Sequence, residues 1–180
     1  AGLKDLHSPS LLKDIDKAVG RIKKALDKKE MVLVYGDYDV DGITATALLV
    51  MSFSKMGLKV HTYIPDRLKE GYGISKESIK FMKEKKVSLV ITVDCGISSI
   101  EEVGLLNELG IDVIITDHHY PLNGRLPDAL AIINPFRGDC SYPFKLLSGV
   151  GVAFKLIEAV YGRFPEEYMD LVCLGTIADV

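Results

Sequence analysis

The stretch that decides the fold is MVLVYGDYDVDGITATALLV, residues 31–50. Its first five residues form an apolar, β-branched run of the kind that makes a buried strand. Asp37, Asp39 and Asp41 alternate directly after this run, and Gly42 leads into a predicted helix over residues 43–56. The pattern therefore places three carboxylates where a buried strand ends and a helix begins, and a positive charge is needed there to stabilise them.

The same three aspartates also resemble the start of a calcium loop of the EF-hand type. Such a loop requires a glutamate at its twelfth position and a helix on each side. Counting from Asp37, the twelfth position is Leu48, and the segment before Asp37 has the pattern of a strand. The EF-hand interpretation therefore fails on both requirements.

The composition is that of an ordinary globular protein. The chain has 180 residues, of which 48% are hydrophobic, and a net charge of −3, which excludes a uniformly basic surface but not a local groove for nucleic acid. No charge-free stretch approaches the roughly 20 residues of a membrane span, and no signal-peptide pattern is present, so we expect a cytoplasmic protein without a membrane partner. Cys95, Cys140 and Cys173 form no CxxC pair, and we expect reduced core residues.

Strand-like and helix-like segments alternate along the chain. Ser8-Pro9 indicates a helix start, and apolar residues at spacings of three and four continue to Leu26, which predicts an N-terminal amphipathic helix. The other predicted helices cover residues 43–56, 75–85, 99–109, 150–161 and 166–178, and the predicted strands cover 31–35, 59–64, 87–93, 112–116 and 129–133. This alternation predicts an α/β fold of three layers, with a mainly parallel five-stranded sheet and helices on both faces. We expect the helix within residues 1–30 to pack on a domain formed by residues 31–180.

Acidic clusters follow three of the predicted strands. Besides the three aspartates after the first strand, Asp94 ends the run VSLVITVD, and Asp117, His118 and His119 end the run DVIITDHH. Open α/β sheets bind ligands at the carboxyl ends of their strands, so we expect these clusters to converge. Crowded carboxylates either take up protons or are held ionised by cations. Oxygen ligands with one or two imidazoles suit Mn²⁺ or Mg²⁺ better than Zn²⁺, which predicts two ions bridged by one aspartate.

A site of this kind is suited to phosphoryl hydrolysis. A water shared between two ions is acidified and attacks phosphorus in line, while the metals and a positive side chain take up the charge that develops on oxygen. His119 is our candidate for that side chain. Asp117 is our candidate for the group that fixes the tautomer of an imidazole.

Each cluster has a simpler interpretation when it is taken alone. An aspartate after a strand is commonly a turn or N-cap residue, and residues 98–101 after Asp94 have the pattern of a capping box. A His-His pair is more often polar packing than a set of metal ligands. Three such clusters at three successive strand ends are improbable through turn chemistry alone, so the metal-site interpretation is favoured.

Four motifs resemble, in order and spacing, those of the DHH phosphoesterases. They read DYDVDG, VDCGIS, TDHH and LGTIAD, and the family is named for the triplet seen here as residues 117–119. The flanking segments IPDRLKEGYG and INPF…YPFKLLSGVGVAFKL are similar to the RecJ-type subgroup of single-strand DNA exonucleases. The similarity covers nearly the whole chain, including the opening LKDLHSPSLLKDIDKAV.

The resemblance implies a ligand set for two Mn²⁺ or Mg²⁺ ions. The positions that match metal ligands are Asp37, Asp39, Asp41, Asp94, His118 and Asp179. With Asp117 and His119 from the argument above, Asp94 completes the set of candidate catalytic residues. Asp94 matches the bridging carboxylate, whereas Asp37 matches either a ligand or a residue that supports one. Relatives that act on small phosphoesters often carry a histidine four residues before the first ligand aspartate. The chain has Tyr35 at that position, which favours the RecJ-like branch.

The activity implied by the resemblance is that of a 5′ to 3′ single-stranded-DNA-specific exonuclease in DNA repair or recombination. Its partners would be single-stranded DNA and a single-strand-binding protein or a helicase. RecJ-like enzymes carry a substrate-binding domain beyond the fourth motif, so we expect a catalytic DHH domain truncated after that motif, with weak activity alone. Two alternatives stay open: hydrolysis of oligoribonucleotides or small nucleotides by the same metal pair, and a non-catalytic replication scaffold.

Two weaker signals concern substrate binding. Gly149 and Gly151 in SGVGVAFK open a predicted helix, whose N–H groups suit a backbone phosphate, although close helix packing explains the glycines equally well. The aromatic candidates for stacking on bases are Tyr35, Tyr38, Tyr72 and Phe136, although core packing is the better interpretation for them.

Overall fold

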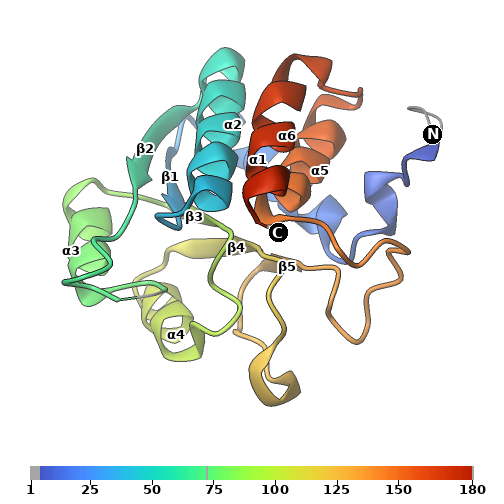
Figure 1. The fold of residues 1–180 in the computed structure, drawn as a ribbon. Coiled ribbons are helices and arrows are strands. Elements are labelled where there is room, and N and C mark those ends of the chain that lie inside the picture. The colour runs from blue at the N-terminus through green and yellow to red at the C-terminus, as the bar shows by residue number, and fades with distance from the viewer. Residues whose placement is uncertain (1–4, 72, 180) are drawn as a thin grey trace.

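A parallel sheet runs through the middle of the computed structural model, which describes residues 5–71 and 73–179 (Figure 1). Tyr72 lies outside the described residues. The five strands lie in the order β2-β1-β3-β4-β5, and every neighbouring pair is parallel. Their bounds are β1 Met31–Gly36, β2 Lys59–Tyr63, β3 Leu89–Val93, β4 Asp112–Thr116 and β5 Ala131–Ile133. The predicted α/β fold with a parallel sheet is confirmed.

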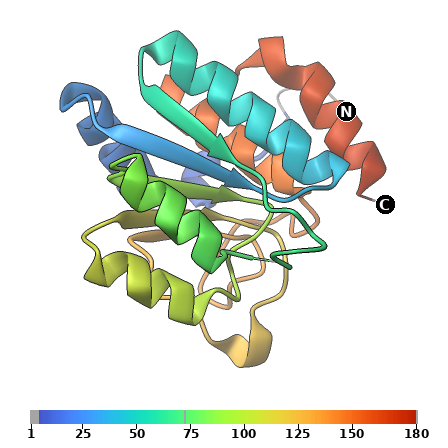
Figure 2. The same cartoon turned by 90° about the vertical axis from the view of Figure 1, so that its left-hand side faces the viewer.

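Alternate side chains of the strands enter two separate cores, because successive residues of a strand point to opposite faces. Val32 and Val34 face α1 (Ile15–Asp27), α2 (Val40–Met56) and α5 (Gly149–Tyr161). Leu33 and Tyr35 face α3 (Lys76–Glu84) and α4 (Ile100–Glu108). The last helix, α6 (Met169–Ala178), packs on α2 and α5. Figures 1 and 2 show the resulting three layers, with the sheet between the two groups of helices.

Helix α2 begins three residues before the predicted start at residue 43. The carboxylate of Asp39 caps the helix by accepting a hydrogen bond from the N–H of Gly42 at 2.8 Å, as an aspartate at the N-cap position commonly does. The first helical turn therefore includes Asp41. A left-handed Gly57, with φ of 85°, ends the helix.

The N-terminal helix begins later than the Ser8-Pro9 signal predicts. Ser8 caps a short 3₁₀ helix, Pro9–Leu11, and α1 starts only at Ile15. Between them Asp14 has φ of 63°, a left-handed conformation that breaks the helical path. The side chain of Asp14 accepts hydrogen bonds from Arg137 Nη1 at 2.6 Å and from Ile132 N at 3.3 Å. These bonds tie the N-terminal segment to β5.

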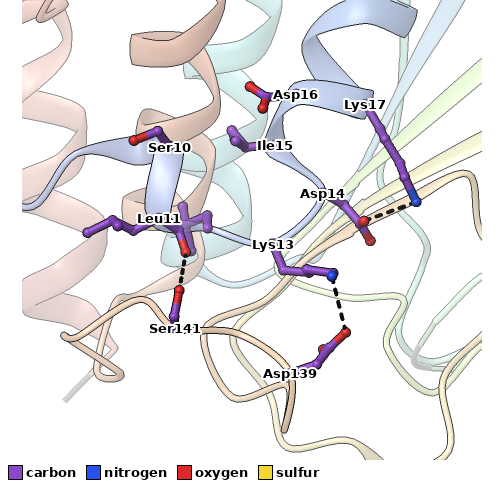
Figure 3. Close-up of a pocket in the computed structure, with 10 residues that line it drawn as sticks. Ser10, Leu11, Lys13, Asp14, Ile15, Asp16, Lys17, Asp139 and Ser141 are labelled. Atoms are coloured by element: carbon purple, nitrogen blue, oxygen red, sulfur yellow. Dashed lines mark hydrogen bonds and ion pairs between the residues drawn. The ribbon is translucent and has the colours of Figure 1, made fainter.

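A hollow of about 350 Å³ lies beside this junction, between the N-terminal segment and the loop that contains Asp139 and Ser141 (Figure 3). Lys13 Nζ lies 3.9 Å from Asp139 Oδ2 across the hollow, and Lys17 Nζ lies 3.2 Å from Asp14 Oδ1. Both lysines of the hollow are thus paired with aspartates that also line it. None of its lining residues belongs to the four acidic motifs.

Several smaller predictions are wrong. Ser99 begins α4 without any side-chain cap hydrogen bond, so residues 98–101 do not form a capping box. Cys95 and Cys140 are buried as expected, but Cys173 is exposed on α6. In addition, β5 has three residues rather than five, and a 3₁₀ turn, Glu166–Tyr168, precedes α6. Within residues 5–71 and 73–179, no helix combines the length and the hydropathy needed to cross a membrane.

Candidate metal centre

The acidic clusters leave three neighbouring strands at the same edge of the sheet. Gly36 of β1 pairs with Val93 of β3, and Val93 pairs with Thr116 of β4. The next residues along the three strands are Asp37, Asp94 and Asp117. The sheet register therefore sets three aspartates side by side, and the expected convergence of the clusters is observed.

Side chains from this edge form overlapping groups whose ligand atoms all lie within 4.8 Å of one another. The groups are Asp37 with Asp39 and Asp94, Asp41 with His118 and Asp179, and Asp94 with His118 and His119. Asp94 and His118 each belong to two groups. All six residues predicted as ligands from the sequence thus lie in one connected cluster, and His119 joins it.

The His118 imidazole lies at the centre of the cluster. Its Nε2 is 3.0 Å from Asp94 Oδ1 and 3.9 Å from Asp41 Oδ2, and its Nδ1 is 3.7 Å from Asp179 Oδ2. Burial would lower the pKa of His118, but the carboxylates of Asp94, Asp179 and Asp41 outweigh burial and raise this pKa to about 9. A proton on His118 therefore balances part of the carboxylate charge in the metal-free protein.

Asp94 is held in a demanding position. Its φ of 60° is left-handed, and only 1% of the residue is exposed. Burial raises the pKa of its carboxyl to about 7, against the lowering effect of His118 and with a further rise from Asp41. A side chain buried next to other acids in a strained backbone conformation is common at functional sites.

Asp41 is fixed by the start of helix α5. Its two carboxylate oxygens accept hydrogen bonds from Gly149 N at 2.5 Å and from Val150 N at 2.8 Å. The N-terminus of a helix favours negative charge. At α5 that negative charge is the Asp41 carboxylate of the protein itself. Close packing, rather than a free anion site, accounts for Gly149, because a β-carbon there would lie 2.6 Å from Asp94 Oδ1.

Asp117 organises the loop that carries the two histidines. Its side chain is fully buried and accepts hydrogen bonds from the N–H groups of Ile97, His118 and His119 at 2.9, 2.8 and 3.1 Å. Its Oδ1 also lies 2.7 Å from His119 Nδ1. The hydrogen bond with Asp117 raises the pKa of His119 above the usual histidine value.

The donor set at this edge consists of hard carboxylate oxygens and imidazole nitrogens. Cys95 follows Asp94 directly, but its sulfur lies 3.9 Å from the carbonyl oxygen of Tyr35 in the core beneath α3 and α4. The thiol therefore faces away from the acidic cluster. Oxygen-rich sets without thiolate suit Mn²⁺ and Mg²⁺, so the residues fit the metals that the resemblance implies.

Sequence reasoning missed residues that support the site without carrying its chemistry. Gly175 of α6 lies so close to α2 that a β-carbon there would clash with Thr44 Oγ1 and would lie 3.0 Å from Asp41 Oδ1. Asn134 is fully buried beside the histidine loop and donates to the carbonyl of His119. Gly175 lies inside the LGTIAD motif, so its sequence position could have indicated a role near the site. A single asparagine after a strand, such as Asn134, gives no such indication.

The aromatic candidates divide between core and surface. Tyr35 is fully buried and donates to the carbonyl of Gly73 at 2.6 Å, which makes it a core residue. The ring of Tyr38 lies under the guanidinium of Arg67, 4.7 Å from its centroid. Phe136 packs against Tyr120, which the sequence did not single out.

The comparisons with known proteins agree with this geometry. The family model described as DHH family, N-terminal domain, matches residues 31–176. The single-stranded-DNA-specific exonuclease RecJ of Bacillus subtilis (strain 168) is 48% identical over 176 residues, which cover 98% of this chain and 22% of that protein.

Two solved structures are also similar. The crystal structure of exonuclease RecJ bound to manganese matches with a TM-score of 0.86 and 40% identity, over 94% of this chain and 44% of that chain. RecJ from Thermus thermophilus in complex with Mn²⁺ matches with a TM-score of 0.76 and 36% identity, over 94% of this chain and 24% of that chain. This chain thus spans less than half of the length of these relatives. Because the family model covers residues 31–176, the chain belongs to the DHH family.

Proposed function

We propose that this chain is the catalytic core of a divalent-metal-dependent phosphodiesterase that degrades single-stranded DNA from its 5′ end. The observation that carries the proposal is the convergence of four acidic motifs on one edge of the sheet, with Asp94 and His118 shared between ligand groups. The similarity to RecJ proteins, named as single-stranded-DNA-specific exonucleases, supports this substrate over a small nucleotide. A role in DNA repair or recombination follows from such an activity.

The residues that would hold two Mn²⁺ or Mg²⁺ ions are Asp37, Asp39, Asp41, Asp94, His118 and Asp179, and Asp94, which belongs to two of the ligand groups, is the proposed shared ligand. A pair of such ions supplies an acidified water and positive charge for the phosphoryl oxygens. The protein holds the carboxylate oxygens of the proposed ligands in place before any metal binds. Asp41 is fixed by two N–H groups of α5, and Asp94 is fixed by the turn after β3 and by the close approach of Gly149.

We assign His119 the role of a positive group beside the reacting phosphate. Its contact with Asp117 orients the ring and raises its pKa, so the imidazole keeps its proton to higher pH than an ordinary histidine. A protonated imidazole stabilises the negative charge that develops on phosphate oxygens in the transition state. Asp117 acts as a positioning residue, because its carboxylate is occupied by backbone N–H groups and by His119.

The relatives are longer than this chain. We propose that residues 31–180 form the catalytic domain, with the helix of residues 1–30 packed on it, and that further domains of the full-length protein grip the DNA. A single-strand-binding protein or a helicase is the proposed source of the DNA strand. Cleavage by the 180 residues alone is therefore expected to be weak.

The test combines metal binding with cleavage in the same samples. Mn²⁺ is titrated by calorimetry into the wild-type chain, Asp94→Asn and the control Asp128→Asn, which changes an exposed carboxylate away from the site. Asparagine suits the left-handed backbone of Asp94, so this variant should fold. Nucleotide release is followed from single strands labelled at the 5′ or the 3′ end, from a duplex, and from a dinucleotide.

The proposal expects two bound Mn²⁺ ions, release from the 5′ end of single strands, and loss of release in Asp94→Asn only. Unchanged turnover in Asp94→Asn would sink the metal mechanism. Faster turnover of the dinucleotide than of the long strand would favour the small-substrate alternative. Metal binding without cleavage of any substrate would mean that the further domains are needed to grip the DNA, whereas no Mn²⁺ binding at all would favour the non-catalytic scaffold.

A further inference from the structure

A second hollow, of about 320 Å³, adjoins the carboxylate edge. It shares His118 and Asp179 with the candidate metal centre, and its remaining lining residues are Phe136, Leu146, Leu147, Ser148 and Thr176. A ligand whose phosphate lies at the metal centre would therefore have its neighbouring group at this mainly apolar wall. The volume is that of a small-ligand site.

Phe136, which lines this hollow, belongs to an aromatic pair. The ring of Tyr120 packs on the ring of Phe136, with centroids 4.0 Å apart and planes inclined by 31°. Tyr120 follows His119 directly in the chain, and 70% of the residue is exposed. Leu146 on the same hollow is 73% exposed. Flat apolar surface is thus presented beside the acidic cluster.

The position of the aromatic pair relative to the histidine loop is fixed by Asn134. This residue is fully buried where β5 ends, next to the end of β4. Its Nδ2 donates to the carbonyl of His119 at 2.9 Å, and its Oδ1 accepts from the N–H of Phe136 at 2.7 Å. One buried amide therefore holds both backbones, so that the distance between Phe136 and the histidine loop is built into the fold.

The chemistry of the hollow suits a nucleobase. A base offers a flat apolar face for the ring of Phe136 and polar edge groups for the hydroxyls of Ser148 and Thr176, whose oxygens lie 2.8 Å apart. We propose that Phe136, with its ring held in place by the packed ring of Tyr120, stacks on the base of a nucleotide that adjoins the cleaved phosphodiester. This inference rests on the proposed function and adds to it a subsite that places the strand relative to the metals.

The test places the fluorescent base 2-aminopurine in turn at each of the first four nucleotides of a 5′-phosphorylated oligothymidylate. The quench on rapid mixing with the Mn²⁺-loaded chain, before the first turnover, reports stacking, and later nucleotide release reports chemistry. The variants are Phe136→Leu, which keeps an apolar side chain without a ring, and Phe136→Tyr, which keeps the ring. Tyr120→Leu probes the exposed partner. Phe81→Leu is the matched control on α3, on the opposite face of the sheet.

The expected result is a quench at one nucleotide, kept in Phe136→Tyr and Phe81→Leu and lost in Phe136→Leu and Tyr120→Leu. An abasic residue at that nucleotide should lower kcat/KM about 5- to 150-fold in the wild type, the range for loss of one base–aromatic stack. In Phe136→Leu the same abasic residue should change kcat/KM less than about twofold, because the interacting partner is already absent.

The outcomes separate this inference from the proposed function. Cleavage with an equal quench at all four nucleotides, or with a quench unchanged in Phe136→Leu, would overturn the stacking subsite and leave the phosphodiesterase standing. A position-specific quench without cleavage would support the subsite and count against the proposed function. Bound Mn²⁺ with no quench at any nucleotide would mean that the hollow is closed to bases, which also overturns the inference.

Discussion

The substitution Gly149→Ala adds one methyl group where α5 meets the metal centre. A β-carbon on Gly149 would lie 2.6 Å from Asp94 Oδ1 and from Asp94 Cβ, whereas ordinary contact begins near 3.4 Å. Asp94 or the start of α5 would have to retreat by about 0.8 Å, the difference between these distances. Asp94 is fully buried in a left-handed turn, so part of the displacement must reach its carboxylate and the hydrogen bonds from α5 to Asp41.

The magnitude follows from two separate costs. Overpacking a closely packed interior lowers the free energy of unfolding by about 1–3 kcal/mol. Ligand distances in metal sites are held to about 0.2 Å, which is several times smaller than the required shift. Disturbing groups that orient ligands lowers metal affinity by about 10- to 100-fold. We therefore expect Gly149→Ala to lose stability and at least about tenfold in Mn²⁺ affinity.

Urea unfolding of the metal-free chain and calorimetric Mn²⁺ titration measure the two effects. The matched control is Gly20→Ala, where the added β-carbon meets nothing within 4 Å on an exposed face of α1. Alanine is the better helix former by about 0.5–1 kcal/mol, so the same chemical change should stabilise the protein there. Wild-type stability and Mn²⁺ affinity in Gly149→Ala would refute the close approach of α5 to Asp94.

The remaining predictions concern protonation, an ion pair and the histidine loop. Because the Asp94 carboxyl has a pKa of about 7 in the folded protein and a usual value of 3.8, the folded state keeps a proton that the unfolded state loses. Urea unfolding of the metal-free chain should therefore show stability falling from about pH 4 to pH 7, with a shallower fall in Asp94→Asn. Arg21→Ala should lower the free energy of unfolding, measured in urea, by about 2–3 kcal/mol, because buried Arg21 pairs with Glu30 and with the half-exposed Asp112. A decrease below about 0.5 kcal/mol would contradict this reasoning. His119→Gln should lower turnover about 10²- to 10³-fold, because it removes a positive group beside the phosphate, while calorimetry shows Mn²⁺ affinity changed less than about tenfold. A larger loss of affinity would make His119 a ligand instead.

Much of the fold is predictable because strands and helices bury side chains with different periods. The β-branched run before Asp37, and its counterparts before Asp94 and Asp117, indicate buried parallel strands, and parallel strands end at a common edge. The approximate location of the site follows from that rule alone. The grouping of Asp37, Asp94, Asp117 and His118 follows from motif order and topology, whereas Asp179, at the end of α6, was predicted as a ligand only through the resemblance to the DHH phosphoesterases.

The unpredicted features depend on contacts between residues far apart in sequence. The N–H groups of α5 bind Asp41 across more than a hundred residues, and no periodicity reveals such a pairing. The Ser8-Pro9 signal is a genuine cap, but Asp14 breaks the helix because its carboxylate binds Arg137 and Ile132. The role of Asn134 was also unpredictable, because it depends on a hydrogen bond to His119 in the loop that follows the adjacent strand.

The junction at Asp14 determines where a minimal domain can be cut. The family model begins at residue 31, yet Ile15, Ala18 and Ile22 of α1 belong to the same buried cluster as the sheet. Trimming to the motif-bearing residues would uncover that apolar face and would leave the buried Arg137 guanidinium with Asp139 as its one carboxylate among the described residues. The uncovered apolar face would lower the solubility of the trimmed protein. Because Arg137 follows Phe136 directly in the chain, the loss of its contact with Asp14 would also loosen the aromatic pair. A minimal domain for expression should therefore begin before Ser8, which caps the 3₁₀ helix at the start of the N-terminal segment, and not at the first motif.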